Sequence, residues 1–277
     1  MIKRIISRID IKNSYLVKGI QLEGLRVLGY PEEFAKKYYE EDIDEVIFQD
    51  IVASLYKRNQ SKLVAKKITE DIFVPIVVGG GIKTLEDVQD ILMHGADRAC
   101  INTGAIKNPD FIEKSALKFG SSTISIAIET LNIKDHYKVY TDSGRSETNL
   151  NLFDWIKKVQ DLGAGEIILT AIANEGTSKG FDLGLYEKVS KICKIPLIAH
   201  GGAGKPQDVL ELFKKVDING CVIASAFHYF YMNRLKKNKI VLGGSSNFLN
   251  NENFDQNNNF GISELKKYLN SNNIKTR

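Results

Sequence analysis

The sequence predicts an α/β protein whose eight parallel strands close into a (β/α)8 barrel with a twofold repeat of its halves. Three observations predict this fold. Short runs rich in valine and isoleucine alternate with amphipathic segments, which is typical of a parallel sheet covered by helices. The length of 277 residues suits a single barrel of about 250 residues. Motifs of the first half also return in order in the second, and a closed ring divides evenly into two halves. A doubly wound open sheet is the alternative.

The apolar runs predict eight strands. They are Arg4–Ile11, Glu45–Ile51, Ile76–Gly79, Arg98–Asn102, Thr123–Glu129, Glu166–Ala171, Pro196–His200 and Cys221–Ser225. The segments between and after them have helical periodicity. These are Pro31–Glu41, Lys62–Glu70, Thr84–His94, Pro109–Phe119, Leu152–Leu162, Leu183–Ile192, Pro206–Lys215 and Ser263–Leu269. Pro31 and Pro206 suit the first turn of a helix, and Thr84 to Asp87 has the form of a capping box.

Small residues follow the strands at corresponding places in the two halves. In the first half these are Gly80-Gly81 after one strand and Asn102-Thr103 after the next. The second half has Gly202-Ala203-Gly204 and Ala224-Ser225. Small residues let backbone N–H groups approach an anion, so two such sets predict a ligand with a phosphate at each end. A tight turn without a ligand is the alternative at each glycine.

Two carboxylates also occupy corresponding positions. Asp10 and Glu129 each close an apolar run, so they should face each other across the mouth of the barrel. Such a pair can divide the acid and base roles if its surroundings separate the two pKa values. The alternative for each residue is a solvated charge or a helix cap. Lys18, after the first strand, could reach a phosphate or could be solvated.

Three segments interrupt the pattern of strand and helix. Residues 12–29 and 130–149 follow strands at the end of the barrel where active sites lie, so we predict that they form lids. The second of them should contain a short hairpin, because Tyr137–Thr141 precedes Asp142-Ser143-Gly144-Arg145. Residues 229–261 include an asparagine-rich stretch and are predicted to be a mobile insertion in a single domain spanning residues 1–277.

Composition excludes several classes of protein. The net charge of +4 is too small to indicate nucleic-acid binding, and no stretch is long and apolar enough to predict a membrane span. Cys100, Cys193 and Cys221 have no metal-binding spacing and indicate reduced thiols in a cytoplasmic protein. We expect no metal and no cofactor. His200 and His228 are each predicted to be packed in the core.

The combined motifs resemble the cyclase subunit of imidazole glycerol phosphate synthase. The resemblance runs from Lys3 to Tyr229 and resumes at Ile262–Leu269. It rests on Lys3–Ile6 with Asp10, Val17–Gly19, Asp50–Ser54, Val78–Ile82, Ile101–Thr103, Gly163–Ile167, Glu175–Thr177 with Gly180–Asp182, Gly201–Gly204 and Ala224–His228. A related isomerase of histidine synthesis shares the barrel and the paired carboxylates, but Gly163–Ile167 and Phe227-His228 are similar to the cyclase.

The resemblance implies a lyase of histidine biosynthesis. The enzyme would convert a phosphoribulosyl-formimino-aminoimidazole-carboxamide ribotide, with a phosphate at each end, and ammonia into imidazole glycerol phosphate and aminoimidazole carboxamide ribotide. A glutaminase subunit at the N-terminal face of the barrel would supply the ammonia.

The resemblance also implies roles for individual residues. Asp10 and Glu129 would be the acid–base pair, and Lys18 would lie on a closing loop. The substrate and its phosphates would be bound by Gly81, Asn102, Thr103, Glu175, Gly176, Thr177, Gly202, Ala203, Ala224 and Ser225. An ammonia gate at the bottom of the barrel would consist of Arg4, Glu45, Arg98 and Glu166.

Several residues depart from the family pattern. Glu129 and Glu175 stand where the family has aspartates, His200 replaces a small residue, Arg8 replaces a cysteine and Arg98 replaces a lysine. Most of these changes lie near the catalytic end. They favour a second hypothesis, a paralogue that conducts ammonia for an amidotransferase acting on a surface-glycan sugar. A phosphosugar isomerase without an ammonia entrance is a third.

Overall fold

The protein is a closed parallel barrel, as the sequence predicts. The structure, a computed structural model, describes residues 2–53, 71–235 and 259–277. Eight parallel strands form the ring in the order β1 (Arg4–Lys12), β4 (Glu45–Asp50), β5 (Ile76–Gly79), β6 (Arg98–Ile101), β7 (Ile124–Ile133), β10 (Glu166–Ala171), β11 (Leu197–His200) and β12 (Gly220–Ile223). Pairing of β12 with β1 and of β7 with β10 completes the ring.

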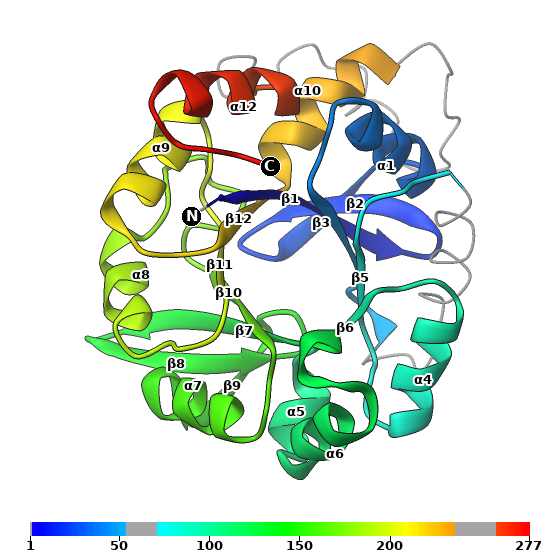
Figure 1. Cartoon of the computed structure of the whole chain (residues 1–277), viewed down its shortest axis with the longest axis vertical. Coiled ribbons are helices and arrows are strands. Elements are labelled where there is room, and N and C mark those ends of the chain that lie inside the picture. Colours follow the sequence, from blue (N-terminus) through cyan, green and yellow to red (C-terminus); the bar gives the residue numbers. More distant parts are fainter. Residues whose placement is uncertain (1, 54–70, 236–258) are drawn as a thin grey trace.

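Helices surround the ring on its outer side (Figure 1). They are α1 (Pro31–Glu40), α4 (Leu85–Met93), α5 (Thr103–Lys107), α6 (Asp110–Phe119), α7 (Leu152–Asp161), α8 (Leu183–Ser190), α9 (Pro206–Lys215), α10 (Ser225–Leu235) and α12 (Ile262–Ser271). The predicted capping box of α4 is present, because Thr84 Oγ1 accepts from the Asp87 N–H and the Asp87 carboxylate accepts from the Thr84 N–H. The helix predicted at Lys62–Glu70 lies outside the described residues. No helix in the described ranges is long and apolar enough to cross a membrane.

The inside of the barrel is built in layers, because alternate residues of each strand point to the axis. One layer is a ring of apolar and small side chains with one member from each strand. It consists of Ile6, Ile47, Val77, Cys100, Ala127, Ile168, Ile198 and Val222. A layer of charged residues lies beneath this apolar ring at the N-terminal ends of the strands. The catalytic candidates lie above it at the C-terminal ends.

Two antiparallel hairpins extend from the C-terminal end of the barrel. Segment 12–29 forms β2 (Tyr15–Ile20) and β3 (Glu23–Gly29), which continue from β1. The predicted hairpin after β7 is confirmed and contains β8 (His136–Thr141) and β9 (Ser146–Asn151). Leu22 at the tip of the first hairpin packs against Tyr140 of the second and Ile172 after β10. The two hairpins therefore contact each other over the mouth of the barrel.

Residues 229–261, between β12 and α12, were predicted to be a mobile insertion, and the structure differs from this prediction at both ends of the segment. Residues 229–235 continue α10, and Phe260 is buried in the core before α12 begins. Phe260 packs edge-on against Phe227 with ring centroids 5.7 Å apart, which fixes the return of the chain to the barrel. The remainder of the predicted mobile segment, residues 236–258, lies outside the described residues.

A glycine just before β10 allows two segments of backbone to lie close together. A Cβ atom on Gly165 would collide with the backbone carbonyl of Ser121, in the 3-10 turn Ser121–Thr123 before β7. The Gly165 N–H donates to the carbonyl oxygen of Ile124 at 3.0 Å. The motif Gly163–Ile167 thus brings two backbones together and places Glu166 inside the bottom of the barrel.

We predict that Gly165→Ala lowers the free energy of unfolding by about 1–3 kcal/mol, because the methyl group forces the two backbones apart. Gly184→Ala in α8 is the matched control, since the nearest atom to its added methyl group would be Asp182 Oδ1 at 3.7 Å. The control should leave stability unchanged or raise it by up to about 1 kcal/mol. Urea denaturation measures both, and equal effects would contradict the role given to Gly165.

Candidate active site

Asp10 and Glu129 lie on opposite sides of one chamber. Their strands, β1 and β7, are four positions apart in either direction around the ring. Each side chain belongs to the inward-facing set of its strand, above Ile6 on β1 and above Ala127 on β7. Each residue is only 4% exposed, so neither is a solvated strand-end charge. The Asp10 charge acts on the Glu129 carboxyl, so the two share one electrostatic environment.

Glu129 is the carboxyl group whose surroundings favour the protonated form. Burial raises its pKa to about 7, against the lowering influence of the Arg8 charge and of one backbone hydrogen bond. That bond comes from the Gly144 N–H to Glu129 Oε2 at 2.8 Å. The negative charges of Asp10 and Glu175 reinforce the rise in pKa. A group with this pKa can both donate and accept a proton near neutral pH.

Asp10 has a cationic partner of its own. Arg8 Nε donates to Asp10 Oδ1 at 2.7 Å, and both side chains are buried. Burial works to lower the pKa of Arg8, but Asp10, Glu129 and Glu175 together raise it above its usual range. Arg8 therefore remains a cation inside the barrel. The sequence marked it only as a departure from the family pattern.

Lys18 is not on a flexible or solvated loop. It lies in β2, is 1% exposed and forms a buried ion pair with Glu175 after β10. The same Glu175 accepts from the Leu22 N–H at 3.1 Å through Oε2, and its backbone carbonyl accepts from the Gln21 N–H at 2.9 Å. Lys18 and Glu175 therefore hold the first hairpin against the loop after β10.

Both histidines near the site are buried and uncharged. His228 packs on Tyr38, whose hydroxyl lies 2.5 Å from Nδ1, and burial lowers its pKa to about 3. This confirms the predicted core histidine. His200 Nδ1 lies 3.0 Å from Thr170 Oγ1. Burial, with the charges of Arg8 and Lys18, lowers the pKa of His200 well below its usual range.

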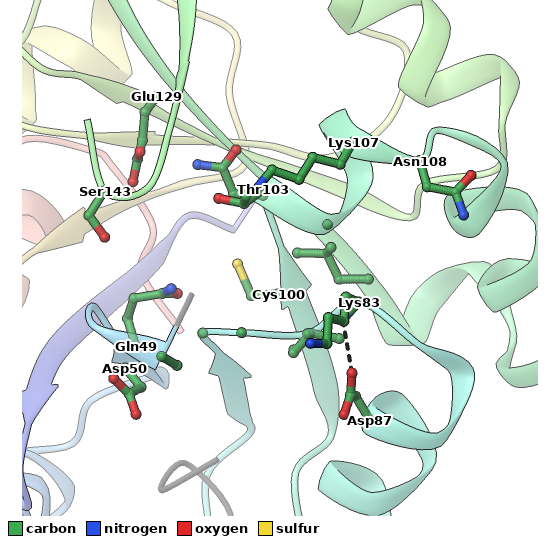
Figure 2. Close-up of a pocket in the computed structure, with 17 residues that line it drawn as sticks. Gln49, Asp50, Lys83, Asp87, Cys100, Thr103, Lys107, Asn108, Glu129 and Ser143 are labelled. Atoms are coloured by element: carbon green, nitrogen blue, oxygen red, sulfur yellow. Dashed lines mark hydrogen bonds between the residues drawn. The ribbon is translucent and has the colours of Figure 1, made fainter. Parts of the chain in front are cut away.

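The first set of small residues borders an open cleft of about 450 Å³. Gly81, Asn102 and Thr103 line it as predicted, and Glu129 reaches it from β7. In Figure 2, Glu129 and Ser143 lie on one side of the cleft, and Lys83 and Asn108 lie on the other. The sequence reasoning missed seven polar residues that line this cleft, namely Gln49, Asp50, Lys83, Asp87, Lys107, Asn108 and Ser143. For Lys83, Lys107 and Asn108, their positions soon after the glycine and Asn-Thr turns were the available signal.

The second set borders a much smaller space of about 10 Å³. The predicted residues that line it are Glu175, Gly176, Gly202, Ala203, Ala224 and Ser225. His200 also lines it and occupies the position where the sequence resemblance implies a small side chain. Thr177 lines neither cleft, because its hydroxyl donates to the Asn174 carbonyl at 2.7 Å within the turn.

The four predicted gate residues form a ring of ion pairs at the opposite end of the barrel. Glu45 Oε2 lies 3.0 Å from Nη1 of both Arg4 and Arg98. Glu166 contacts the same two arginines, at 3.4 Å for Arg98. Burial, then the neighbouring Glu166, raises the pKa of Glu45, while the arginines oppose this. The ring thus has two cations and two anions around the barrel axis.

These features define a barrel enzyme equipped for acid–base chemistry at the carboxyl ends of its strands. The chain belongs to the histidine biosynthesis protein family, whose profile matches residues 4–233. It is 46% identical over 228 residues to the imidazole glycerol phosphate synthase subunit HisF of a Hydrogenobaculum species, covering 82% of this chain and 90% of that protein. It is 47% identical over 206 residues to HisF of Legionella pneumophila, covering 74% and 97%. Thermococcus onnurineus HisF is 43% identical over 227 residues, covering 82% and 90%.

We predict that Glu129→Gln removes a pH dependence of stability. The folded protein retains a proton on Glu129 up to a pKa of about 7, whereas the ordinary value is 4.5. The Glu129 contribution to the free energy of unfolding therefore falls as pH rises through this window, by on the order of 3 kcal/mol.

Urea denaturation at pH values from 4.5 to about 7 measures the free energy of unfolding of the native protein and of the variant, and the difference between them. The lowered histidine pKa values act equally on both proteins and cancel in that difference. Glu113→Gln, at an exposed position on α6, is the control and should follow the native protein. Parallel pH curves for Glu129→Gln and the native protein would contradict the prediction.

Proposed function

We propose that this chain is the cyclase subunit of an imidazole glycerol phosphate synthase. It uses ammonia to convert the phosphoribulosyl-formimino-aminoimidazole-carboxamide ribotide into imidazole glycerol phosphate and aminoimidazole carboxamide ribotide. The observation that carries the proposal is the pair of buried carboxylates facing one chamber, with the pKa of one raised to about 7. Family membership and HisF relatives at 43–47% identity agree with it.

The two carboxylates divide the proton transfers of the cyclisation. Glu129, with a pKa of about 7, gives a proton to the leaving group or takes one from the attacking nitrogen. Asp10, paired with Arg8, is the second proton-transfer group on the opposite side. The first cleft binds one phosphate of the substrate, with backbone N–H groups at Gly81 and Thr103 and the cationic Lys83 and Lys107 around it.

Ammonia reaches the chamber along the axis of the barrel. The ring of Arg4, Glu45, Arg98 and Glu166 surrounds this axis at the bottom, with balanced charges. The apolar ring with Ile6 and Val222 follows it. Ammonia is small and uncharged, so balanced charges do not exclude it, and an apolar layer disfavours ammonium ion.

A partner subunit docks on the N-terminal face. Four of the exposed large apolar side chains belong to segments at this end of the barrel. Ile2 precedes β1, Phe73 precedes β5, and Met93 and Leu117 lie in the last turns of α4 and α6. Their exposures are 58%, 78%, 76% and 81%. Exposed apolar groups near a channel entrance favour a protein partner there, and a glutaminase is the partner that supplies ammonia.

We predict that Phe73→Asp, Met93→Asp and Leu117→Asp each weaken binding of the glutaminase at least about tenfold, because each places a charge in a dehydrated interface. Isothermal titration calorimetry with a purified glutaminase subunit of an imidazole glycerol phosphate synthase measures the affinity. Ile20→Asp is the matched control, since Ile20 is 52% exposed on the β2–β3 hairpin at the other end. A loss of affinity only in the control would place the partner at the catalytic end.

The cyclase activity is tested by turnover of the ribotide with ammonium salt alone. We predict turnover by the native chain and a fall of about 10²- to 10⁴-fold for Asp10→Asn and for Glu129→Gln, because each variant lacks a proton-transfer group. Glu113→Gln should retain full activity. The absence of product at high concentration of the native protein would refute the proposal.

One observation favours a second function. The second cleft encloses about 10 Å³ and is lined by His200, which suits a substrate without a second phosphate. In that case the chain would conduct ammonia for an amidotransferase acting on a surface-glycan sugar. Complementation separates the two functions, because the cyclase restores growth of a histidine auxotroph and the conduit activates a glutaminase without restoring growth.

A further inference from the structure

Arg8 forms the floor of the reaction chamber. Arg4, Ile6, Arg8 and Asp10 alternate along β1, so they follow one another along the inside of the barrel. Ile6 belongs to the apolar ring, and Arg8 is the next inward residue above it. It is 4% exposed. The guanidinium therefore lies between the apolar passage and the catalytic carboxylates.

The charge of Arg8 acts on residues of several strands of the barrel. Arg8 acts on Cys100 of β6, Glu129 of β7 and His200 of β11, and it interacts with Glu175 after β10. Its direct hydrogen bond is made to Asp10 through Nε. The buried Nη2 atom has no hydrogen-bond partner within the described part of the chain. Arg8 thus forms a hydrogen bond with Asp10 and lowers the pKa of Glu129 without a hydrogen bond to it.

The two cations of the chamber are both paired with carboxylates other than Glu129. Arg8 pairs with Asp10, and Lys18 pairs with Glu175. Glu129 accepts one backbone hydrogen bond, from Gly144, and forms no ion pair among the described residues. Arg8 and Lys18 thus balance Asp10 and Glu175, which leaves no cation paired with Glu129. Asp50, a further buried carboxyl at the same cleft, accepts from the Val52 N–H.

The groups on the strands next to Glu129 do not supply a positive charge. Asp50, Lys83 and Lys107 line the same cleft but are not among the charges that act on Glu129. Cys100 on β6 is a neutral thiol, because burial raises its pKa to about 12. Tyr140, opposite Glu129 on β8, is a neutral phenol, because burial and then Glu147 raise its pKa. His200 on β11 is neutral, and Thr170 on β10 has an uncharged hydroxyl. Arg8 is therefore the cation that acts on Glu129 from the residues packed around it.

We propose that Arg8 is a positioning residue that distinguishes the two catalytic carboxyl groups, because it holds Asp10 through a buried hydrogen bond and leaves Glu129, without an ion pair of its own, as the carboxyl that carries the proton. The assignment deepens the proposed function and rests on it for its catalytic meaning. A cysteine at this position, which the sequence resemblance implies for the family, supplies neither the charge nor the hydrogen bond. Arg8 therefore offsets, in this chain, the longer Glu129 and Glu175 side chains that bring negative charge further into the chamber.

The proposal is tested by titrating Glu129 directly in the free protein. Glutamate is labelled with ¹³C at the side-chain carboxyl, and the Glu129 signal is identified by its absence in Glu129→Gln. In the native protein the titration midpoint is expected near pH 7. Arg8→Met removes the cation with little change in length, and the midpoint should rise by about one pH unit or more. Arg8→Lys keeps the charge and should restore most of the native midpoint.

Arg26→Met is the matched control. Arg26 is exposed on β3 and is not among the charges that act on Glu129, so the midpoint should stay at the native value. An unchanged midpoint in Arg8→Met, or an equal rise in Arg8→Lys and Arg8→Met, would overturn the proposal. Should Arg8→Met fail to fold, Arg8→Gln provides a second measurement, because it removes the charge but keeps an N–H donor for Asp10, and it must raise the midpoint of Glu129. An unmoved midpoint in Arg8→Gln overturns the proposal equally.

The titration uses no substrate, ammonia or partner. Even if the protein does not turn over the ribotide, the titration therefore shows whether Arg8 changes the pKa of Glu129. An active cyclase whose Glu129 does not respond to Arg8 would leave the proposed function standing and remove this assignment.

Discussion

The burial of charge inside the barrel is the constraint on which the rest of the structure depends. A parallel barrel has no solvent within its apolar layers, so each ionised group there needs a counter-charge or must become neutral. At the bottom, Arg4 and Arg98 alternate with Glu45 and Glu166, and every member has two partners. In the chamber the pairing is incomplete. Neither Glu129 nor Asp50 forms an ion pair in the described residues, and burial raises the pKa of both, that of Glu129 to about 7.

The same constraint explains why the lids are ordered elements. Lys18 could remain solvated on a mobile loop, but β2 places it against Glu175, and removal of one member of a buried pair costs about 3–5 kcal/mol. This pair and the contact of Leu22 with Tyr140 join the first hairpin to the rest of the mouth. The second hairpin supplies the Gly144 N–H to Glu129, so its turn is part of the catalytic geometry. Opening either hairpin would therefore change the electrostatics of the carboxylates as well as access to them.

The features that could be predicted from the sequence are those that follow from local patterns of residues and from the internal repeat. The strands from Arg4 to Ile223 follow from their valine and isoleucine runs, and the corresponding positions of Asp10 and Glu129 predict that they face each other. The solvated alternative for Lys18 was wrong, because the partner Glu175 is 157 residues away and no local pattern reveals it. The space within a cleft also depends on neighbouring elements, so the two sets of small residues could not be distinguished from sequence. The burial of Arg8 could have been predicted, since it shares the inward face of β1 with Asp10.

The unequal clefts show how a repeated scaffold acquires an asymmetric site. Both halves place glycines at positive φ after a strand, with Gly81 at 71° and Gly202 at 111°, so the backbone turns are comparable. The side chains beside them are not. The first cleft of about 450 Å³ contains Lys83 and Lys107, whereas neutral His200 lines the second, of about 10 Å³. The first cleft also contains the carboxyl groups of Asp50 and Asp87, so its advantage for a dianion is its space together with its two lysines. In the proposed cyclase, the first cleft would therefore set the orientation of the substrate. Because Glu129 lines that first cleft and Asp10 lines neither, a substrate anchored in the first cleft would have its bound end on the side of Glu129.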